Sequence, residues 1–422
     1  MGDREVSRTR GTAARPAAPA KGRAAKPQPQ PPARPGPINP ILNGPGEYPF
    51  VTLDRMRRAL VPSDVRVIHF GMGDPREETP EFIRAALREG ITPVSSYPSA
   101  VGQPELRAAA ARWFARRFGV ALDPERHLLP ANGTKEAVFL MALAVVGHGG
   151  TDARRTVVIP SPAYPVYEPG ARFAGAEVHF VPLQGADGWR FDPDRVPEAV
   201  WKRTALLWLN YPHNPTGAVL ARADYARVLE RARAHGFWVA SDEAYAEVWF
   251  DTPPPSILEC GFENAVALHT LSKRSAMTGY RSGFIAGDER LIAALRRFRP
   301  NVGVATPDFV QRAAIAAWDD DAHAVRQRER YAAKRRLLLD EFRRRGWEVE
   351  ASEASFYLWM KVAGGDDVGF VRDLMRVGLV ATPGSFMGEA GAGFVRWALV
   401  PTLGDCREAM DRLEAITITG TP

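Results

Sequence analysis

Cysteine is almost missing from this 422-residue chain, which holds only two, Cys260 and Cys406. They stand far apart and lack metal-site spacing, so the sequence argues against a disulfide framework and predicts no metal centre. No apolar run reaches the roughly 18 to 20 residues that cross a bilayer. The longest run, 137–147, is typical of a buried helix. We therefore expect a cytoplasmic protein with no membrane partner.

The net charge of +6 arises at one end of the chain. Residues 1–36 hold eight basic side chains against Asp3 and Glu5, so the remainder is near balance and we expect no nucleic-acid partner. The same stretch is rich in Ala, Pro and Arg and offers little to a hydrophobic core. We interpret it as a disordered tail, either a dispensable extension or a transit peptide.

Short apolar strands alternate with helices along the rest of the chain. Strands are expected at 67–70, 156–159, 206–210, 237–241, 266–269, 283–286, 355–359 and 394–399. This alternation predicts an α/β fold in which helices cover both faces of a mostly parallel sheet. Most of the many charges between residues 288 and 345 are interpreted as solvated helix faces.

Lys273 follows one of these strands, in a run of small and hydroxylated residues. Ligands of open α/β sheets bind at the carboxyl ends of strands, and an amine there can condense with an aldehyde to form a Schiff base. Thr270 and Ser272 offer hydroxyl groups, and Arg281 offers a planar cation, a combination suited to a phosphate. The alternative is that Lys273 is one more surface cation.

Other strand ends carry further candidates. Asp242 can pair with a pyridine nitrogen and keep it protonated, and Tyr245 can hydrogen-bond a ring oxygen, although an acidic helix start is an alternative for this motif. Asn214, in an Asn-Pro-Thr-Gly turn, can donate to the same oxygen. Arg396 stands inside an apolar strand, where its guanidinium fits a carboxylate, although arginine side chains also extend from strand faces to solvent.

Two glycine-containing turns complete the pattern. Gly73 follows the first strand, where a missing side chain lets backbone approach a ligand, although Gly-Asp-Pro is also ordinary turn chemistry. Near residue 133, a turn opens the apolar helix, with Asn132 and Thr134 as candidate caps. The N–H groups of a helix start form a phosphate cradle, and a simple capped helix is the alternative.

Taken in order from residue 38 to about 418, these motifs resemble the class I/II aminotransferases, the fold-type I enzymes that use pyridoxal phosphate. The resemblance implies a large domain with a mostly parallel central sheet flanked by helices, and a smaller α/β domain built from both chain ends. The expected boundaries are a tail at 1–36, an N-terminal arm and part of the small domain at 37–74, the cofactor-binding domain at 75–299, and the small domain at 300–422.

The resemblance also assigns roles. It implies that Lys273 carries pyridoxal phosphate and moves the proton in catalysis, with Asp242 and Tyr245 as further catalytic residues. Gly73 and Arg396 bind the substrate carboxylate, and Asn214 contacts both cofactor and substrate. The implied cofactor site comprises Gly133, Thr134, Lys135, Tyr164, Asn214, Asp242, Tyr245, Thr270, Ser272, Lys273, Arg281 and Tyr97. Tyr97 reaches the phosphate of a neighbouring subunit, which implies a homodimer with shared active sites.

Within this family, the segments 272–275, 281–284 and 317–320 resemble the N-succinyldiaminopimelate aminotransferase branch, whereas 276–280 departs from it. The expected reaction transfers an amino group from glutamate to N-succinyl-2-amino-6-ketopimelate, in lysine and diaminopimelate biosynthesis. Aminotransferases for alanine, aspartate, aromatic residues or LL-diaminopimelate are alternatives. A pyridoxal-phosphate β-lyase and a regulator with an aminotransferase-like domain are more distant ones.

Overall fold

The structure is a computed structural model and describes residues 36–43, 47–147 and 154–414. Nearly all of the expected disordered tail lies outside these residues. Residues up to Gly44 and residues from Pro45 onward form two separate units. The described part of the first unit contains one 3-10 turn, η1 (Pro40–Asn43). Among the described residues, no helix has the length and apolar character needed to cross a membrane.

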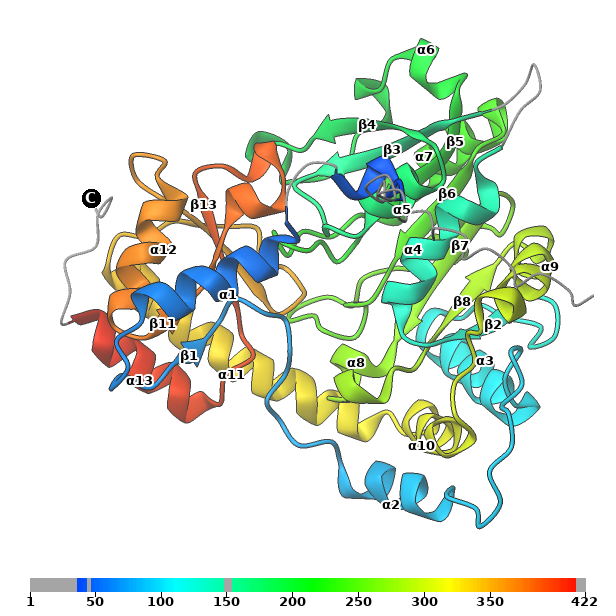
Figure 1. The fold of residues 1–422 in the computed structure, drawn as a ribbon, viewed down its shortest axis with the longest axis horizontal. Helices are drawn as coiled ribbons and strands as arrows, with labels where there is room; N and C mark the ends of the chain where they lie inside the picture. The colour runs from blue at the N-terminus through cyan, green and yellow to red at the C-terminus, as the bar shows by residue number, and fades with distance from the viewer. Residues whose placement is uncertain (1–35, 44–46, 148–153, 415–422) are drawn as a thin grey trace, which may run out of the picture. The chain divides into compact units, whose positions relative to one another are not determined.

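The second unit is built on a seven-stranded sheet in the order β2-β8-β7-β6-β5-β3-β4 (Figure 1). The strands are β2 (Leu128–Ala131), β3 (Thr156–Ser161), β4 (Glu177–Pro182), β5 (Thr204–Leu209), β6 (Trp238–Asp242), β7 (Ala265–Thr270) and β8 (Gly283–Gly287). Strands β3 to β7 pair in parallel, whereas β8 runs antiparallel to β7 and β2. The central strands are almost entirely buried, as continuous apolar runs require in a sheet covered on both faces.

Alternate residues of these strands enter two separate hydrophobic cores. Leu207 and Leu209 of β5 pack with one set of helices, whereas Leu206 and Trp208 pack with another. The first set is α3 (Pro104–Phe118), α7 (Arg222–His235) and α10 (Asp308–Asp319); the second is α4 (Thr134–Val145), α5 (Tyr167–Phe173) and α9 (Glu289–Phe298). Because successive side chains of a strand point to opposite faces, helices cover both sides of the sheet. Helix α2 (Glu81–Glu89) lies against α10, and the short α6 (Glu198–Trp201) precedes β5.

A third core joins the two ends of the chain. It combines residues from α1 (Pro49–Leu60) and β1 (Ile68–His69) with residues from 331 onward, and it also includes Tyr245 and Val248 from the segment after β6. Its later elements are α11 (Ala322–Arg344), β9 (Val349–Glu350), β10 (Tyr357–Lys361), α12 (Asp367–Arg376), β11 (Leu379–Val380), β12 (Thr382–Pro383), β13 (Phe394–Ala398) and α13 (Leu403–Glu414). Strand β1 pairs with β11, and β12-β13-β10-β9 form an antiparallel sheet.

The predicted fold class is confirmed: a mostly parallel sheet with helices on both faces and a smaller α/β part from both chain ends. Predicted strands match closely, except that the strand expected at 355–359 is found at Tyr357–Lys361. The expected domain boundaries near residues 74 and 299 stay predictions.

Strands β5, β6 and β7 end at Leu209, Asp242 and Thr270, so polar residues meet at one edge of the sheet.

Candidate active site

A cavity of about 420 Å³ lies at this carboxyl edge. The chain brings most of the predicted residues to its wall: Gly73, Thr134, Lys135, Tyr164, Asn214, Asp242, Tyr245, Thr270, Ser272, Lys273, Arg281 and Arg396. Gly133 lies directly before this wall, at the start of α4. Tyr97 is fully exposed and does not line the cavity of its own chain.

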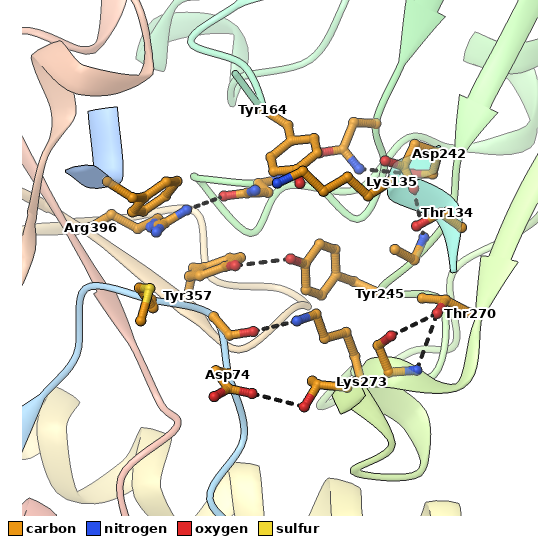
Figure 2. Close-up of a pocket in the computed structure, with 18 of the residues that line it drawn as sticks. Asp74, Thr134, Lys135, Tyr164, Asp242, Tyr245, Thr270, Lys273, Tyr357 and Arg396 are labelled. Carbon is orange, nitrogen blue, oxygen red and sulfur yellow. Dashed lines mark hydrogen bonds between the residues drawn. The ribbon is translucent and has the colours of Figure 1, made fainter. Parts of the chain in front are cut away.

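Lys273 lies in the short helix α8 (Leu271–Arg274), directly after β7. Thr270 accepts a hydrogen bond from the Ser272 N–H (3.2 Å) and so caps this helix. The buried Lys273 amine donates to the Gly73 carbonyl (Figure 2). Burial lowers the pKa of Lys273 to about 8, with smaller contributions from Arg281 and from Arg396. A lysine with a lowered pKa is a nucleophile near neutral pH.

The lowered pKa of Lys273 predicts an unusual pH dependence of aldehyde capture. Only the neutral amine attacks an aldehyde, and a pKa of about 8 leaves roughly a tenth of the amine neutral at pH 7. Between pH 6 and 10, we expect the rate at which cofactor-free protein captures pyridoxal phosphate to rise until about pH 8 and then level off. Stopped-flow absorbance measures this rate, with Lys273→Arg as the control. A rate still rising steeply at pH 10 contradicts the prediction.

Asp242 ends β6 and points its carboxylate into the cavity. The carboxylate accepts hydrogen bonds from the Tyr167 hydroxyl (2.9 Å) and from the Ala244 N–H (3.3 Å). Burial raises the pKa of Asp242 to about 6, partly offset by these two bonds. The side chain is therefore largely ionised at neutral pH and supplies a fixed negative charge. The Asn210 side-chain amide donates to the Asp242 carbonyl (2.8 Å) and braces this strand end.

Tyr245 and Tyr357 join their hydroxyl groups across the cavity wall, with 2.9 Å between the oxygens. Tyr245 follows β6 in the large sheet, whereas Tyr357 begins β10 near the other end of the chain (Figure 2). Burial raises the pKa of the Tyr245 hydroxyl well above its usual range, so Tyr245 is a neutral hydrogen-bond donor. The sequence offered no signal for Tyr357, because a tyrosine in an apolar strand is ordinary core composition.

The opposite end of the cavity carries hydroxyl, N–H and cationic groups. Thr134 begins α4, and the Thr270 hydroxyl donates to the Ser272 hydroxyl (2.9 Å). The Arg281 guanidinium donates to the carbonyls of Thr278 (2.8 Å) and Asn132 (3.3 Å). The predicted caps Asn132 and Thr134 are wrong, since Gly133 holds the N-cap position and no side chain caps the helix there.

Gly133 has a positive φ of 73°, and a Cβ at this position would meet the Arg281 guanidinium. Glycine therefore keeps backbone and cation close together at the helix start. A hydroxyl-rich and cationic cradle at one end of the cavity, a carboxylate at Asp242 and the Lys273 amine in the same cavity match the phosphate, ring nitrogen and aldehyde of pyridoxal phosphate. The residues present thus fit the expected cofactor.

Arg396 lies in β13 and is buried at 1% exposure. Its guanidinium donates to the Asn214 side-chain oxygen (2.8 Å), to the Gly71 carbonyl (2.6 Å) and weakly to the Thr382 hydroxyl (3.4 Å). All of these partners are neutral, and the guanidinium also lies 4.4 Å from the Tyr357 ring. A buried cation is costly unless an anion pairs with it, so this cation at the cavity wall is suited to pair with a carboxylate.

Sequence reasoning missed several other residues of the cavity wall. They are Tyr48, Phe50, Met72, Asp74, Asn210, Ala244, Thr278 and Tyr357. Tyr48 and Phe50 come from the start of α1, and the Phe50 ring lies 5.4 Å from the Arg396 guanidinium. Asp74 accepts a hydrogen bond from the Thr278 hydroxyl (2.8 Å) and opposes the lowering of the Lys273 pKa. Among the described residues, no group of His, Cys, Asp or Glu is arranged to hold a metal ion.

Gly73 gives a prediction that depends only on the room available for a side chain at this position. A Cβ at Gly73 would meet the Tyr357 hydroxyl and lie 3.2 Å from the Phe356 ring. Gly73→Ala should therefore break the pair of hydroxyls at Tyr245, lower kcat/KM about tenfold and cost about 1–3 kcal/mol of unfolding free energy. The matched control is Gly279→Ala, because nothing lies within 4 Å of a Cβ at Gly279. Equal kinetics and melting temperatures for the two variants would contradict this reading.

Comparison with known proteins gives a consistent result. The family model for aminotransferase class I and II matches residues 65–413. An LL-diaminopimelate aminotransferase from Desulforudis audaxviator is 37% identical over 374 residues, which cover 87% of this chain and 94% of that protein. Among solved structures, an aminotransferase from Neisseria meningitidis is 33% identical with a TM-score of 0.83, covering 90% of this chain and all of that one. A probable N-succinyldiaminopimelate aminotransferase from Thermus thermophilus is 30% identical with a TM-score of 0.80, covering 87% and 100%.

Proposed function

Because the chain belongs to the class I and II aminotransferase family, we propose that it transfers an amino group between two pairs of compounds. One pair is LL-diaminopimelate and its keto acid, and the other is glutamate and 2-oxoglutarate. The protein is a pyridoxal-phosphate-dependent aminotransferase. The observation that supports this substrate is the relative 37% identical to the chain along almost its whole length. The N-succinyl branch expected from the sequence thus becomes the second candidate, supported by the Thermus thermophilus structure and by the segments 272–275 and 281–284.

Each cavity residue then receives a role. When bound, pyridoxal phosphate supplies an aldehyde that takes up the amino group and a ring that draws electrons from the substrate's α-carbon. The Asp242 carboxylate would pair with the ring nitrogen and favour its protonated form. Tyr245 and Asn214 would donate to the ring oxygen, and Tyr164 would contact the ring. The phosphate would be held by Gly133, Thr134, Lys135, Thr270, Ser272 and Arg281.

The substrate binds between the large sheet and the smaller α/β part formed by both chain ends. Arg396 and the backbone at Gly73 hold its α-carboxylate, which places the α-carbon near the Lys273 amine. Lys273 removes the α-proton and returns a proton at the carbon that accepted the amino group. Its lowered pKa suits this exchange, because a base works best with a pKa near the working pH. A second keto acid then reverses the sequence, so ping-pong kinetics are expected.

A homodimer with shared active sites is part of the proposal. Tyr97 is fully exposed and lies outside the cavity of its own chain, so a role at the phosphate requires a second subunit. A hybrid dimer formed from one Tyr97→Phe chain and one Lys273→Ala chain tests whether Tyr97 acts in its own subunit or across the interface. If Tyr97 acts across the interface, the hybrid keeps one site with both residues intact and retains activity, with each variant alone as control.

A screen of half-reactions tests the substrate. The loaded enzyme is mixed with LL-diaminopimelate, N-succinyl-LL-diaminopimelate or glutamate, and absorbance follows conversion of the cofactor from its aldehyde to its amine form. Conversion by LL-diaminopimelate and glutamate supports the proposal. Conversion by the N-succinyl compound, and not by LL-diaminopimelate, favours the second candidate. Release of pyruvate or ammonia without conversion indicates a β-lyase and overturns both.

Arg396 gives a further prediction for this site. Arg396→Gln removes the buried cation, so we expect kcat/KM to fall about 100-fold, mainly through KM, as loss of one partner from a buried charge pair costs about 2–5 kcal/mol. Steady-state kinetics with substrates that carry an α-carboxylate measure this effect. Decarboxylated analogues of the same substrates should lose far less. The exposed Arg407→Gln serves as the matched control.

A further inference from the structure

An ion pair lies beneath the phosphate end of the cavity and takes no part in the roles above. Arg299 begins η6 (Arg299–Val302), which follows α9, and its side chain is 2% exposed. Glu136 lies in the first turn of α4 and is 19% exposed. Two nitrogens of the guanidinium each donate to one carboxylate oxygen, at 3.2 Å in both cases. Arg299 is thus an exception to the solvated faces expected between residues 288 and 345.

The pair is connected to the turn that leads into α4. Glu136 accepts a hydrogen bond from the Asn132 N–H (3.2 Å), and Arg299 donates to the Pro130 carbonyl. The Thr306 hydroxyl donates to the Asn132 side-chain oxygen (2.6 Å). The turn is therefore fixed from beneath on both sides of Ala131, whereas Arg281 holds the Asn132 carbonyl from the cavity side. Neither Arg299 nor Glu136 lines the cavity.

The charge of Glu136 matters as much as its hydrogen bond. A carboxylate is favourable in the first turn of a helix, where N–H groups are unpaired. The same N–H groups face the phosphate in the proposed cofactor site, and an uncompensated carboxylate there would repel a phosphate dianion through a poorly screened medium. Arg299 neutralises Glu136 without entering the cavity, so the phosphate meets the N–H groups and Arg281 without an opposing charge.

We infer that Arg299 and Glu136 are positioning residues for the cofactor phosphate: the carboxylate shapes the turn, and the guanidinium cancels its charge. This inference depends on the proposed placement of the phosphate at Gly133 and Thr134. The inference predicts that phosphate binding depends on the balance of charge between Arg299 and Glu136. A role in packing alone predicts no such dependence. Removing the cation should weaken phosphate binding, and removing both charges together should restore it.

The experiment measures the dissociation constants of cofactor-free protein for pyridoxal phosphate and for pyridoxal, which lacks the phosphate. We expect Arg299→Gln to weaken binding of pyridoxal phosphate about tenfold or more through repulsion by Glu136, and to leave pyridoxal within about twofold. The double variant Arg299→Gln, Glu136→Gln should return to near the wild-type value. Glu136→Gln alone should bind pyridoxal phosphate at least as tightly as wild type, since Arg299 then adds positive charge.

Three results overturn the inference: equal losses for pyridoxal and pyridoxal phosphate, a double variant as weak as Arg299→Gln, or weak binding by Glu136→Gln. If Arg299→Gln does not fold, the Glu136→Gln and double variants still decide. Phosphorus NMR gives a second signature, because uncompensated Glu136 should favour the monoanion of the bound phosphate at neutral pH. Thr134→Ala tests the placement separately. If it leaves the preference for pyridoxal phosphate over pyridoxal intact, the proposed cradle fails and the inference fails with it, whereas a lost preference together with unchanged binding by Arg299→Gln overturns the role of the pair alone.

Discussion

Replacing Lys273 with alanine should abolish transamination, lowering kcat/KM by about 10⁴-fold or more, because in the proposed mechanism this one side chain supplies both the nucleophile and the general base. The buried amine lies between the Gly73 carbonyl and the cofactor cradle, and no other lysine amine among the described residues shares this cavity except the exposed Lys135. Single-turnover kinetics with saturating cofactor separate loss of chemistry from loss of cofactor.

Two further variants make the Lys273 result specific. Lys273→Arg keeps a positive charge but no neutral amine at working pH, so it should be as inactive as Lys273→Ala. Lys361→Ala removes an exposed lysine on β10 and should retain full activity. A Lys273→Ala enzyme that kept activity within tenfold of wild type would show that the base and the covalent anchor lie elsewhere.

Asp242→Asn should lower kcat about 10³-fold, which corresponds to about 4 kcal/mol of activation free energy. The amide keeps the size of the side chain and can still meet the Tyr167 hydroxyl, but it cannot supply the negative charge that favours a protonated ring nitrogen. The ring then withdraws electrons less effectively from the α-carbon. Carbon-deuterium isotope effects on kcat should increase, since proton removal becomes slower.

A cofactor analogue provides the control for Asp242. Pyridoxal phosphate methylated at its ring nitrogen carries a permanent positive charge, so it should restore much of the activity of Asp242→Asn. Asp194→Asn, an exposed carboxylate change, should behave as wild type. If the methylated cofactor restores nothing, or if Asp242→Asn is fully active, the charge of Asp242 has a role other than the one assigned here.

The pH dependence of cofactor binding follows from the Asp242 carboxylate. Burial raises the pKa of Asp242 from 3.8 to about 6, so its ionised form is lost as the pH falls through about 6. A bound cation at the ring nitrogen should lower this pKa, because an opposite charge nearby favours the ionised carboxylate. The cofactor-free protein should therefore bind the cofactor less tightly below pH 6.

Much of the fold was predictable because buried strands consist of runs of apolar residues. Strands β5 and β7 are apolar runs buried on both faces, and such runs stand out in a sequence. The strand predicted at 355–359 begins two residues too early because Ser355 and Phe356, which precede β10, are as buried as the strand itself. The antiparallel direction of β8 depends on a short connection that apolar pattern does not reveal.

The sequence led to residues that share one cavity where an informative side chain stands in a recognisable turn, as at Lys273, Asp242 and Asn214; their chemical roles stay predictions. Residues were missed where the role depends on contact between distant elements. Tyr357 meets Tyr245 across 112 positions, and Arg299 meets Glu136 across 163. The preference for the N-succinyl branch rested on short segments, and comparison along the whole chain favours the LL-diaminopimelate relatives.

The connection between β7 and β8 has a consequence for how such proteins diversify. Antiparallel pairing of Thr270 with Gly283 fixes both ends of this connection, which carries Lys273 and Arg281. An insertion there would shift the amine relative to the guanidinium, so its length is constrained. Gly73 follows β1 and Arg396 lies in β13, so both come from the two ends of the chain. Changes in those end segments can therefore alter what the enzyme accepts without changing the length of the connection that carries Lys273 and Arg281.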